Sequence, residues 1–284
     1  MRKTLLILCL VGIMVLGTAG LALAKNTRYG PPCIADDAGT EPKKTLEWGT
    51  SVIQTWDSSF YTTTIITALT YGITDHLEAY VAPYVLNAVW GRDLHTGGNA
   101  ALRAAYGFHG ANNQTFSDIW IGAKYQFLEE LKGKAAPAMA VKYGLKIPGR
   151  TNSKGFTTGE VDHKLTYCVT KSLGKAQADG NVAFRYYHRS DDPAVGNAFT
   201  NEWSWNASLM YPIAPKTLLA AELTGKNEYR KIHMTKDDYI TDAYLGVKYS
   251  VTKNFKGKIA VGKRITCADP DILGYLGLVY YFHL

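Results

Sequence analysis

Apolar and polar residues alternate along most of this chain, from about residue 45 to its last residue. The segment 116–127 shows the pattern most clearly: Ile119 and Ile121 fall on one parity, and Asp118 and Lys124 fall on the other. Successive side chains of a β-strand point to opposite faces, so the alternation predicts strands with one apolar and one polar face.

About twelve such runs follow one another, and most are longer than the roughly five or six residues usual for strands of soluble proteins. A tilted strand that crosses a membrane needs about 9–11 residues, which matches these runs. The predicted strands cover residues 45–56, 62–72, 76–87, 116–127, 135–147, 161–172, 180–189, 201–212, 216–228, 238–250, 255–266 and 272–284.

The connections between these strands alternate in length. Even-numbered strands are followed by short turns, at 74–75, 129–134, 174–179, 212–215 and 252–254. Odd-numbered strands are mostly followed by longer polar stretches, at 88–115, 148–160, 190–200 and 229–237, with short exceptions at 57–61 and 267–271. Short turns on one side and long loops on the other are typical of outer-membrane barrels.

The end of the chain gives an independent signal. Apolar residues occupy every second position from Leu276 to Leu284, which resembles the closing strand of outer-membrane barrels, although the usual final residue is Phe. Hydrocarbon leaves no partner for an open sheet edge, so such a sheet must close. We therefore predict an all-β fold, a transmembrane antiparallel up-and-down β-barrel of about 12 strands over residues 45–284, in the outer membrane of a Gram-negative bacterium.

The first 24 residues have the features of a signal peptide. Arg2 and Lys3 precede a long apolar run, which ends in the small-residue pattern Ala-Leu-Ala at 22–24. An uncleaved anchor helix is the alternative, and the change in composition at Lys25 favours cleavage. Residues 25–44 are expected to form an irregular periplasmic segment.

Composition agrees with this reading. Aromatic residues make up 12% of the chain and Tyr alone counts 19, which suits aromatic girdles at membrane interfaces. Cys33, Cys168 and Cys267 lie outside the signal peptide, far apart and without a C-x-x-C pair. At most one disulfide can form among these three, and a free cysteine packed as a small apolar residue is expected.

Three segments resemble one known family. Residues 32–40 (PCIADDAGT), 71–78 (YGITDHLE) and 274–282 (GYLGLVYYF) are similar to the opening, the first periplasmic turn and the last strand of bacterial outer-membrane proteins named after the meta-pathway of phenol degradation. Cys33 stands where that family more often has an aliphatic residue. The resemblance implies an outer-membrane barrel that passes small or aromatic molecules.

The polar parity of the strands supplies the candidate lumen-lining residues. Basic side chains outnumber acidic ones there, which favours an anion-preferring lumen; a mutually neutralising ion-pair network that fills the barrel is the alternative. The aromatic members could stack on a solute or fill space. The candidates are Glu78, Tyr80, Asp118, Trp120, Lys124, Lys142, Lys164, Arg185, Glu202, Glu222, Asp242, Lys248, Lys258 and Arg264.

A second candidate is the motif formed by Asp36, Asp37, Gly39 and Thr40. The two carboxylates could bind a cation, or they could pin the N-terminal segment inside the barrel through lysines. A solvated periplasmic turn is the third reading, because Asp and Gly are common in turns. We expect a structural role rather than a ligand site.

Catalytic sequence patterns are absent: the chain has no G-x-S-x-G, no H-E-x-x-H and no Gly-rich phosphate loop. We expect no enzyme activity, no cofactor or metal, and no nucleic-acid partner. The expected function is a channel or transporter for small solutes, aromatic or anionic. The alternative is a non-conducting structural or surface-interaction barrel with functional extracellular loops. Expected partners are outer-membrane lipid, the barrel-assembly machinery during biogenesis, and the solute.

Overall fold

A computed structural model describes residues 33–56, 60–91, 112–115, 118–131, 135–149, 160–188, 201–227, 239–266 and 272–284. The expected signal peptide and its cleavage site lie outside the described residues, as do Cys267 and most of the longer loops. No helix among the described residues is long and apolar enough to cross a membrane.

The described residues form strands joined by turns. The strands are β1 (Thr45–Trp56), β2 (Phe60–Thr74), β3 (Leu77–Gly91), β4 (Asn112–Thr115), β5 (Ile119–Leu128), β6 (Ala138–Ile147), β7 (Asp162–Leu173), β8 (Ala176–Tyr186), β9 (Glu202–Ala214), β10 (Thr217–Asn227), β11 (Tyr239–Ser250), β12 (Phe255–Arg264) and β13 (Ile272–His283).

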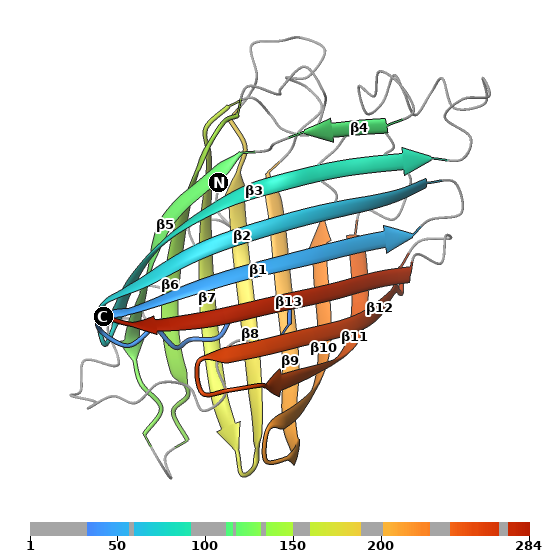
Figure 1. Ribbon diagram of the computed structural model, residues 1–284. Coiled ribbons are helices and arrows are strands. Elements are labelled where there is room, and N and C mark those ends of the chain that lie inside the picture. Colours follow the sequence, from blue (N-terminus) through green and yellow to red (C-terminus); the bar gives the residue numbers. More distant parts are fainter. Residues whose placement is uncertain are drawn as a thin grey trace, which may run out of the picture.

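The sheet closes on itself as an antiparallel barrel (Figure 1). β1 pairs with β2 on one side and with β13 on the other, and β2 pairs in turn with β3. The short β4 and the longer β5 pair with successive parts of β3, so together they take one place in the wall. The barrel therefore has twelve strands around its circumference, which confirms the predicted fold class.

Two predicted connections were wrong. The loop predicted at 88–115 contains the short strand β4. Residues 174–179 were expected to form the connection before a strand at 180–189, but β8 begins at Ala176, and Gly174 and Lys175 alone make the turn. Gly174 adopts a φ of 64°, which suits glycine. Gln177 and Asp179 belong to β8, and both polar side chains are buried inside the barrel.

The outer face of the wall is apolar and carries two aromatic belts. Such belts mark the two membrane interfaces of outer-membrane barrels. The belt near the short turns contains Trp48, Tyr71, Tyr125, Tyr211, Tyr249 and Phe282, and the belt near the opposite rim contains Trp56, Tyr186, Trp203 and Trp205. Thr45 pairs with His283, so β1 begins and β13 ends at the rim of the short turns, the periplasmic rim of this architecture.

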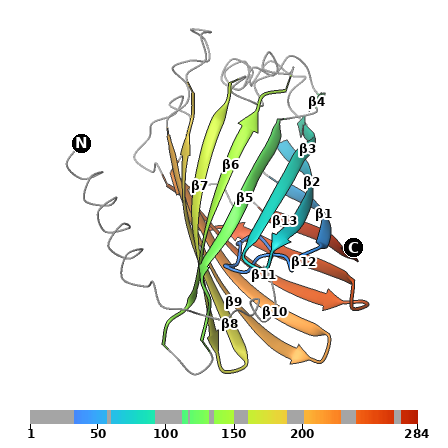
Figure 2. The same ribbon diagram turned by 90° about the vertical axis from the view of Figure 1, so that its left-hand side faces the viewer.

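The residues before β1 enter the barrel. Residues 33–44, here called the interior segment, form no strand (Figure 2, blue stretch before β1), and residues 33–40 hydrogen-bond to side chains of strands on several sides of the barrel. The sequence placed 25–44 as an irregular periplasmic stretch, whereas residues 33–40 lie in the lumen and residues 42–44 are exposed at the rim. The polar backbone of residues 33–40 can lie in the lumen because the inner wall supplies hydrogen-bonding side chains.

Candidate functional site

Glu222 of β10 anchors the start of the interior segment. Its carboxylate accepts hydrogen bonds from three consecutive backbone N–H groups, those of Cys33 (2.6 Å), Ile34 (2.9 Å) and Ala35 (2.9 Å). Successive N–H groups that converge in this way form a concave anion-binding nest. Here the protein's own glutamate occupies the nest, and hydrogen bonds to an ionised acceptor are among the stronger ones.

Asn181 of β8 holds the next residue by its backbone. The Asn181 side-chain oxygen accepts the N–H of Asp36 at 2.7 Å, and the side-chain amide donates to the Asp36 carbonyl at 2.8 Å. Thr170 of β7 then accepts the N–H of Ala38 at 2.8 Å and donates to Asp179 at 2.7 Å. Side chains of the wall thus supply the hydrogen-bond partners that a neighbouring strand would otherwise give to the backbone of the interior segment.

The side chains of Asp36 and Asp37 point into a group of lysines. Asp36 lies 2.6 Å from the Lys142 ammonium and 3.4 Å from that of Lys124, and Lys124 also contacts Asp37 (3.7 Å) and Glu78 (3.2 Å). Burial opposes ionisation of Asp36, but attraction by the two lysines outweighs it and holds the pKa of that carboxyl below its usual range. The structure brings this motif and three lumen candidates into one cluster.

The segment leaves the lumen beside the turn between β2 and β3. Thr40 donates to the Asp75 carbonyl at 2.7 Å, and the Lys44 N–H donates to the Gly72 carbonyl at 2.9 Å. A Cβ atom on Gly72 would lie 2.0 Å from the Pro42 carbonyl oxygen. Only glycine lets the segment approach β2 this closely.

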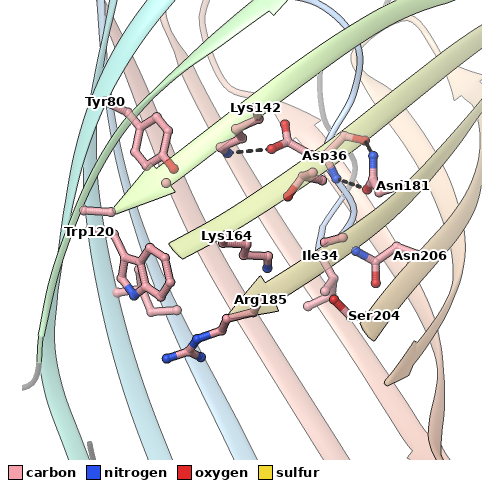
Figure 3. A pocket seen from close by; sticks show the side chains of 15 residues that line it. Ile34, Asp36, Tyr80, Trp120, Lys142, Lys164, Asn181, Arg185, Ser204 and Asn206 are labelled. Carbon is pink, nitrogen blue, oxygen red and sulfur yellow. Dashed lines mark hydrogen bonds and ion pairs between the residues drawn. The ribbon is translucent and has the colours of Figure 1, made fainter. Parts of the chain in front are cut away.

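A cavity of about 280 Å³ lies beside the interior segment. Figure 3 shows Tyr80 and Trp120 on one side of it, and Asn181, Ser204 and Asn206 on the other, with Lys164 and Arg185 between. Residues 34 and 36 belong to its lining, so the interior segment forms part of its wall. The other lining residues come from strands β2, β3 and β5 to β9.

A cationic side chain lies over each of the two aromatic rings that line this cavity, Tyr80 and Trp120. The Lys142 ammonium lies 4.7 Å from the centre of the Tyr80 ring. The Arg185 guanidinium lies 4.9 Å from the Trp120 ring and 4.2 Å from that of Tyr187. Cations within about 6 Å of a ring centre are attracted by its electron-rich face. The cavity therefore offers aromatic surface and positive charge close together.

Many of the other interior charges are paired. Lys146 contacts Asp162 at 2.6 Å and Asp118 at 3.2 Å, and Asp162 also binds Arg185 at 2.8 Å. At another place on the wall, Arg264 lies 3.1 Å from Asp242. The two interpretations of the basic surplus thus each describe part of the interior, because an ion-pair network coexists with a cavity rich in cations.

The remaining sequence candidates also lie on the inner wall. Glu202 accepts a hydrogen bond from the Tyr187 hydroxyl at 3.4 Å. Lys248 and Lys258 face each other across β11 and β12 and are buried, and Gly39 is buried within the interior segment. Sequence reasoning missed Asn181 and Thr170. Asn181 is four residues before Arg185 in the same strand and so lies on the same face, which would have placed its side chain inside the barrel.

The residues that the structure describes include two cysteines, and several carboxylates that lie close to one another. No group of three or more potential metal-ligating side chains occurs among these residues. Cys33 and Cys168 are free and buried, as expected for at least one cysteine. Burial, together with the Glu222 carboxylate, raises the pKa of the Cys33 thiol to about 12, so it stays protonated.

A closed twelve-strand barrel with an apolar belt outside and a polar interior defines an outer-membrane β-barrel protein. The chain belongs to the family described as "Putative MetA-pathway of phenol degradation", whose sequence model matches residues 46–282. This match confirms the family resemblance that the sequence motifs indicated.

Solved structures show the same fold. An outer membrane channel of the COG4313 group from Pseudomonas putida F1 is 16% identical, with a TM-score of 0.64 over 87% of this chain and 99% of that one. The NanC porin is 10% identical, with a TM-score of 0.53 over 82% of this chain and 98% of that one. Comparison with curated proteins gives no significant sequence match.

Proposed function

We propose that this barrel is a channel or transporter for small aromatic or anionic solutes. The observation that carries the proposal is the interior cavity of about 280 Å³, lined by Tyr80, Trp120 and the cations of Lys142, Lys164 and Arg185. A volume of this size lies at the lower end of small-molecule sites. The family description, which names phenol degradation, is consistent with an aromatic solute. The proposal assigns no catalytic step to the chain.

In this proposal the interior segment moves during transport, because residues 33–40 lie in the lumen. The described contacts between the segment and the wall are hydrogen bonds, ion pairs and packing, all of which can be exchanged for contacts with water or solute. Cys33 of the segment is free, as is Cys168 of β7, so no disulfide fixes Cys33 to the wall. We propose that displacement of the segment opens a path along the lumen.

The position of residues 33–40 in the lumen also fits a second candidate, the non-conducting structural or surface-interaction barrel. If the segment never leaves, Glu222, Asn181 and the lysines at Asp36 act only to stabilise the fold. The extracellular loops that would then carry function fall mostly outside the described residues. The two candidates differ in one measurable property, which is conductance.

The test is single-channel recording in planar bilayers with KCl, on the chain from residue 25 onward and on a variant that starts at residue 41. We expect small or rare openings in the first protein and a larger, steady, anion-preferring conductance in the second. Glu222→Gln should raise the open fraction, because an amide replaces a carboxylate that accepts three N–H bonds and each bond to a charged group contributes about 1.5–3 kcal/mol.

Glu130→Gln is the matched control, because Glu130 pairs with Lys171 near the periplasmic rim and does not contact the interior segment. Heat-modifiable migration on gels verifies that each variant is folded. Absence of conductance in all variants, together with absence of solute uptake into liposomes, would rule out the channel and leave the non-conducting barrel.

A further inference from the structure

One row of paired residues crosses the wall of the cavity. Along the row, Tyr80 of β3 pairs with Gly122 of β5, Gly122 with Gly144 of β6, Gly144 with Lys164 of β7, and Lys164 with Arg185 of β8. Side chains directly opposite on antiparallel strands lie on the same face. The row therefore has an aromatic end and a cationic end, separated by two residues without side chains.

The glycines determine how the aromatic end is built. A Cβ atom on Gly122 would lie 2.6 Å from the Tyr80 hydroxyl, and one on Gly144 would lie 2.6 Å from the same atom. The Tyr80 side chain thus lies along the wall over both glycines, and its hydroxyl is 3.3 Å from the Tyr143 carbonyl. Trp120, in the adjacent row, adds a second ring.

The cationic end has unused hydrogen-bonding capacity. Within the described part of the chain, no carboxylate lies within ion-pair distance of Lys164, whereas Lys142 is neutralised by Asp36 at 2.6 Å. The Nε–H of Arg185 is buried and has no acceptor among the described residues, although the guanidinium binds Asp162 through its terminal nitrogen. Buried donors are nearly always satisfied in folded proteins, so an orphan donor in a cavity wall suggests a missing acceptor.

We infer that this cavity is a binding site for a monoaromatic carboxylate, an inference that rests on the proposed transport function and narrows its solute. The ring would pack against Tyr80 and Trp120, and the carboxylate would accept hydrogen bonds from Lys164 and Arg185. A neutral aromatic molecule would leave the ammonium of Lys164 without a counter-charge. A small inorganic anion would leave the aromatic surface uncovered, and the cavity volume suits a single ring.

The test uses isothermal titration of benzoate into the refolded barrel, beginning at residue 25, in detergent. Benzyl alcohol supplies the ring without the charge, and acetate supplies the charge without the ring. We expect benzoate to bind more tightly than either. Lys164→Gln should weaken benzoate binding about tenfold or more, because it removes a charge-assisted hydrogen bond, and should leave benzyl alcohol unaffected.

Two further variants keep the result interpretable. Lys164→Arg retains the positive charge and should bind benzoate within a few-fold of the original protein. Lys175→Gln makes the same charge change in the exposed turn of the same hairpin and should bind benzoate unchanged. Equal affinities for benzoate and benzyl alcohol, or an unchanged benzoate affinity in a folded Lys164→Gln protein, would overturn the inference.

Flux into liposomes separates this inference from the proposed function. Benzoate that binds through Lys164 but never crosses the barrel, even in the variant starting at residue 41, would support the site and contradict the channel. Conductance without any benzoate binding would support the channel and contradict the site.

Discussion

At the scale of residues, the interior segment is recognised mainly through its backbone. Glu222 and Asn181 contact N–H and C=O groups, which every residue except proline possesses in full, and Asp36 adds the charged contact to Lys142. Backbone groups that enter a lumen away from water need partners, because an unpaired buried group costs about 1–3 kcal/mol. Polar side chains on the inner wall therefore determine where the segment lies.

Glu41 should make the docking of this segment sensitive to pH. Burial, together with repulsion from Glu47 and Glu78, raises the pKa of Glu41 to about 9 from an ordinary value of 4.5. Docking therefore takes up a proton between these values, so it is most favourable below about pH 4.5 and weakens as pH rises towards 9. We expect the open fraction in planar bilayers to increase several-fold from pH 6 to pH 9.

Glu41→Gln should remove this dependence, because the amide cannot ionise, whereas the control Glu160→Gln should retain it. The low pKa of Asp36 has the opposite sign, since its contribution to docking is lost only as pH falls through the acid range. An open fraction that falls from pH 6 to pH 9 in the unmodified barrel would contradict the assignment to Glu41.

At the scale of elements, the strands and the interior segment depend on each other at a few close approaches. Gly72 in β2 admits the Pro42 carbonyl. A Cβ added to Gly246 in β11 would meet Ala260 (2.8 Å) and the Ile259 carbonyl (2.9 Å) of β12, and then the Cys33 sulfur at 3.0 Å. Gly72 is small because the interior segment passes over it, whereas Gly246 is confined first by the neighbouring strand. Gly257 in β12 is not confined in this way, because no atom lies within 4 Å of a Cβ added there.

Gly72→Ala should undock residues 40–44 without opening the barrel. The added methyl group would overlap the Pro42 carbonyl oxygen at 2.0 Å, and relief of such overpacking typically costs about 1–3 kcal/mol. Hydrogen exchange at the Glu41 and Lys44 amides, which bond to Glu78 and Gly72, should accelerate. The control Gly257→Ala should leave both exchange rates unchanged, and equal protection in the two variants would show that the close approach is unimportant.

The alternation of side chains predicted the strands and their inward faces, because an apolar belt and a polar lumen impose a strict period of two. It placed Lys142, Arg185 and Glu222 on the polar parity without indicating what they contact. Pinning of Asp36 and Asp37 by lysines inside the barrel was one of three readings of the sequence. The rest of the segment's route could not be predicted, since Glu222 and Asn181 bind its backbone, which leaves no pattern in the sequence. The stretch that was expected as a turn includes the buried polar residues Gln177 and Asp179, and in sequence a polar interior resembles a surface.

At the scale of the whole molecule, the wall separates two environments. Large apolar side chains such as Leu245 and Val261 are more than half exposed on the outer face. Buried ionic side chains such as Lys146 and Asp162 lie on the inner one. Among the described strands, β1 pairs with β13 and so closes the ring, which leaves these two strands without an open edge in lipid. The stability of the barrel therefore depends on lipid contact as much as on its interior.

Leu245→Lys should destabilise the barrel by about 2–4 kcal/mol, the range for a lysine on the lipid face at mid-depth. Leu245 lies in the middle of β11 and is 55% exposed. Tyr249→Lys, at the periplasmic end of the same face, should cost only about 0–1 kcal/mol. Urea unfolding in phospholipid vesicles measures both values. Equal costs at the two depths would mean that the middle of β11 does not face hydrocarbon.

The direct connection of residues 33–44 to β1 makes the interior segment a ligand that is covalently tethered to its own receptor. A short tether of this kind gives an effective concentration in the millimolar range. Even a weak intrinsic affinity would then be enough to keep residues 33–40 in the lumen. A free molecule that competes for the same lumen must reach a concentration comparable to this effective concentration, or bind more tightly than the segment. The tether therefore sets a minimum concentration for entry. The length and stiffness of residues 41–44 would determine that concentration.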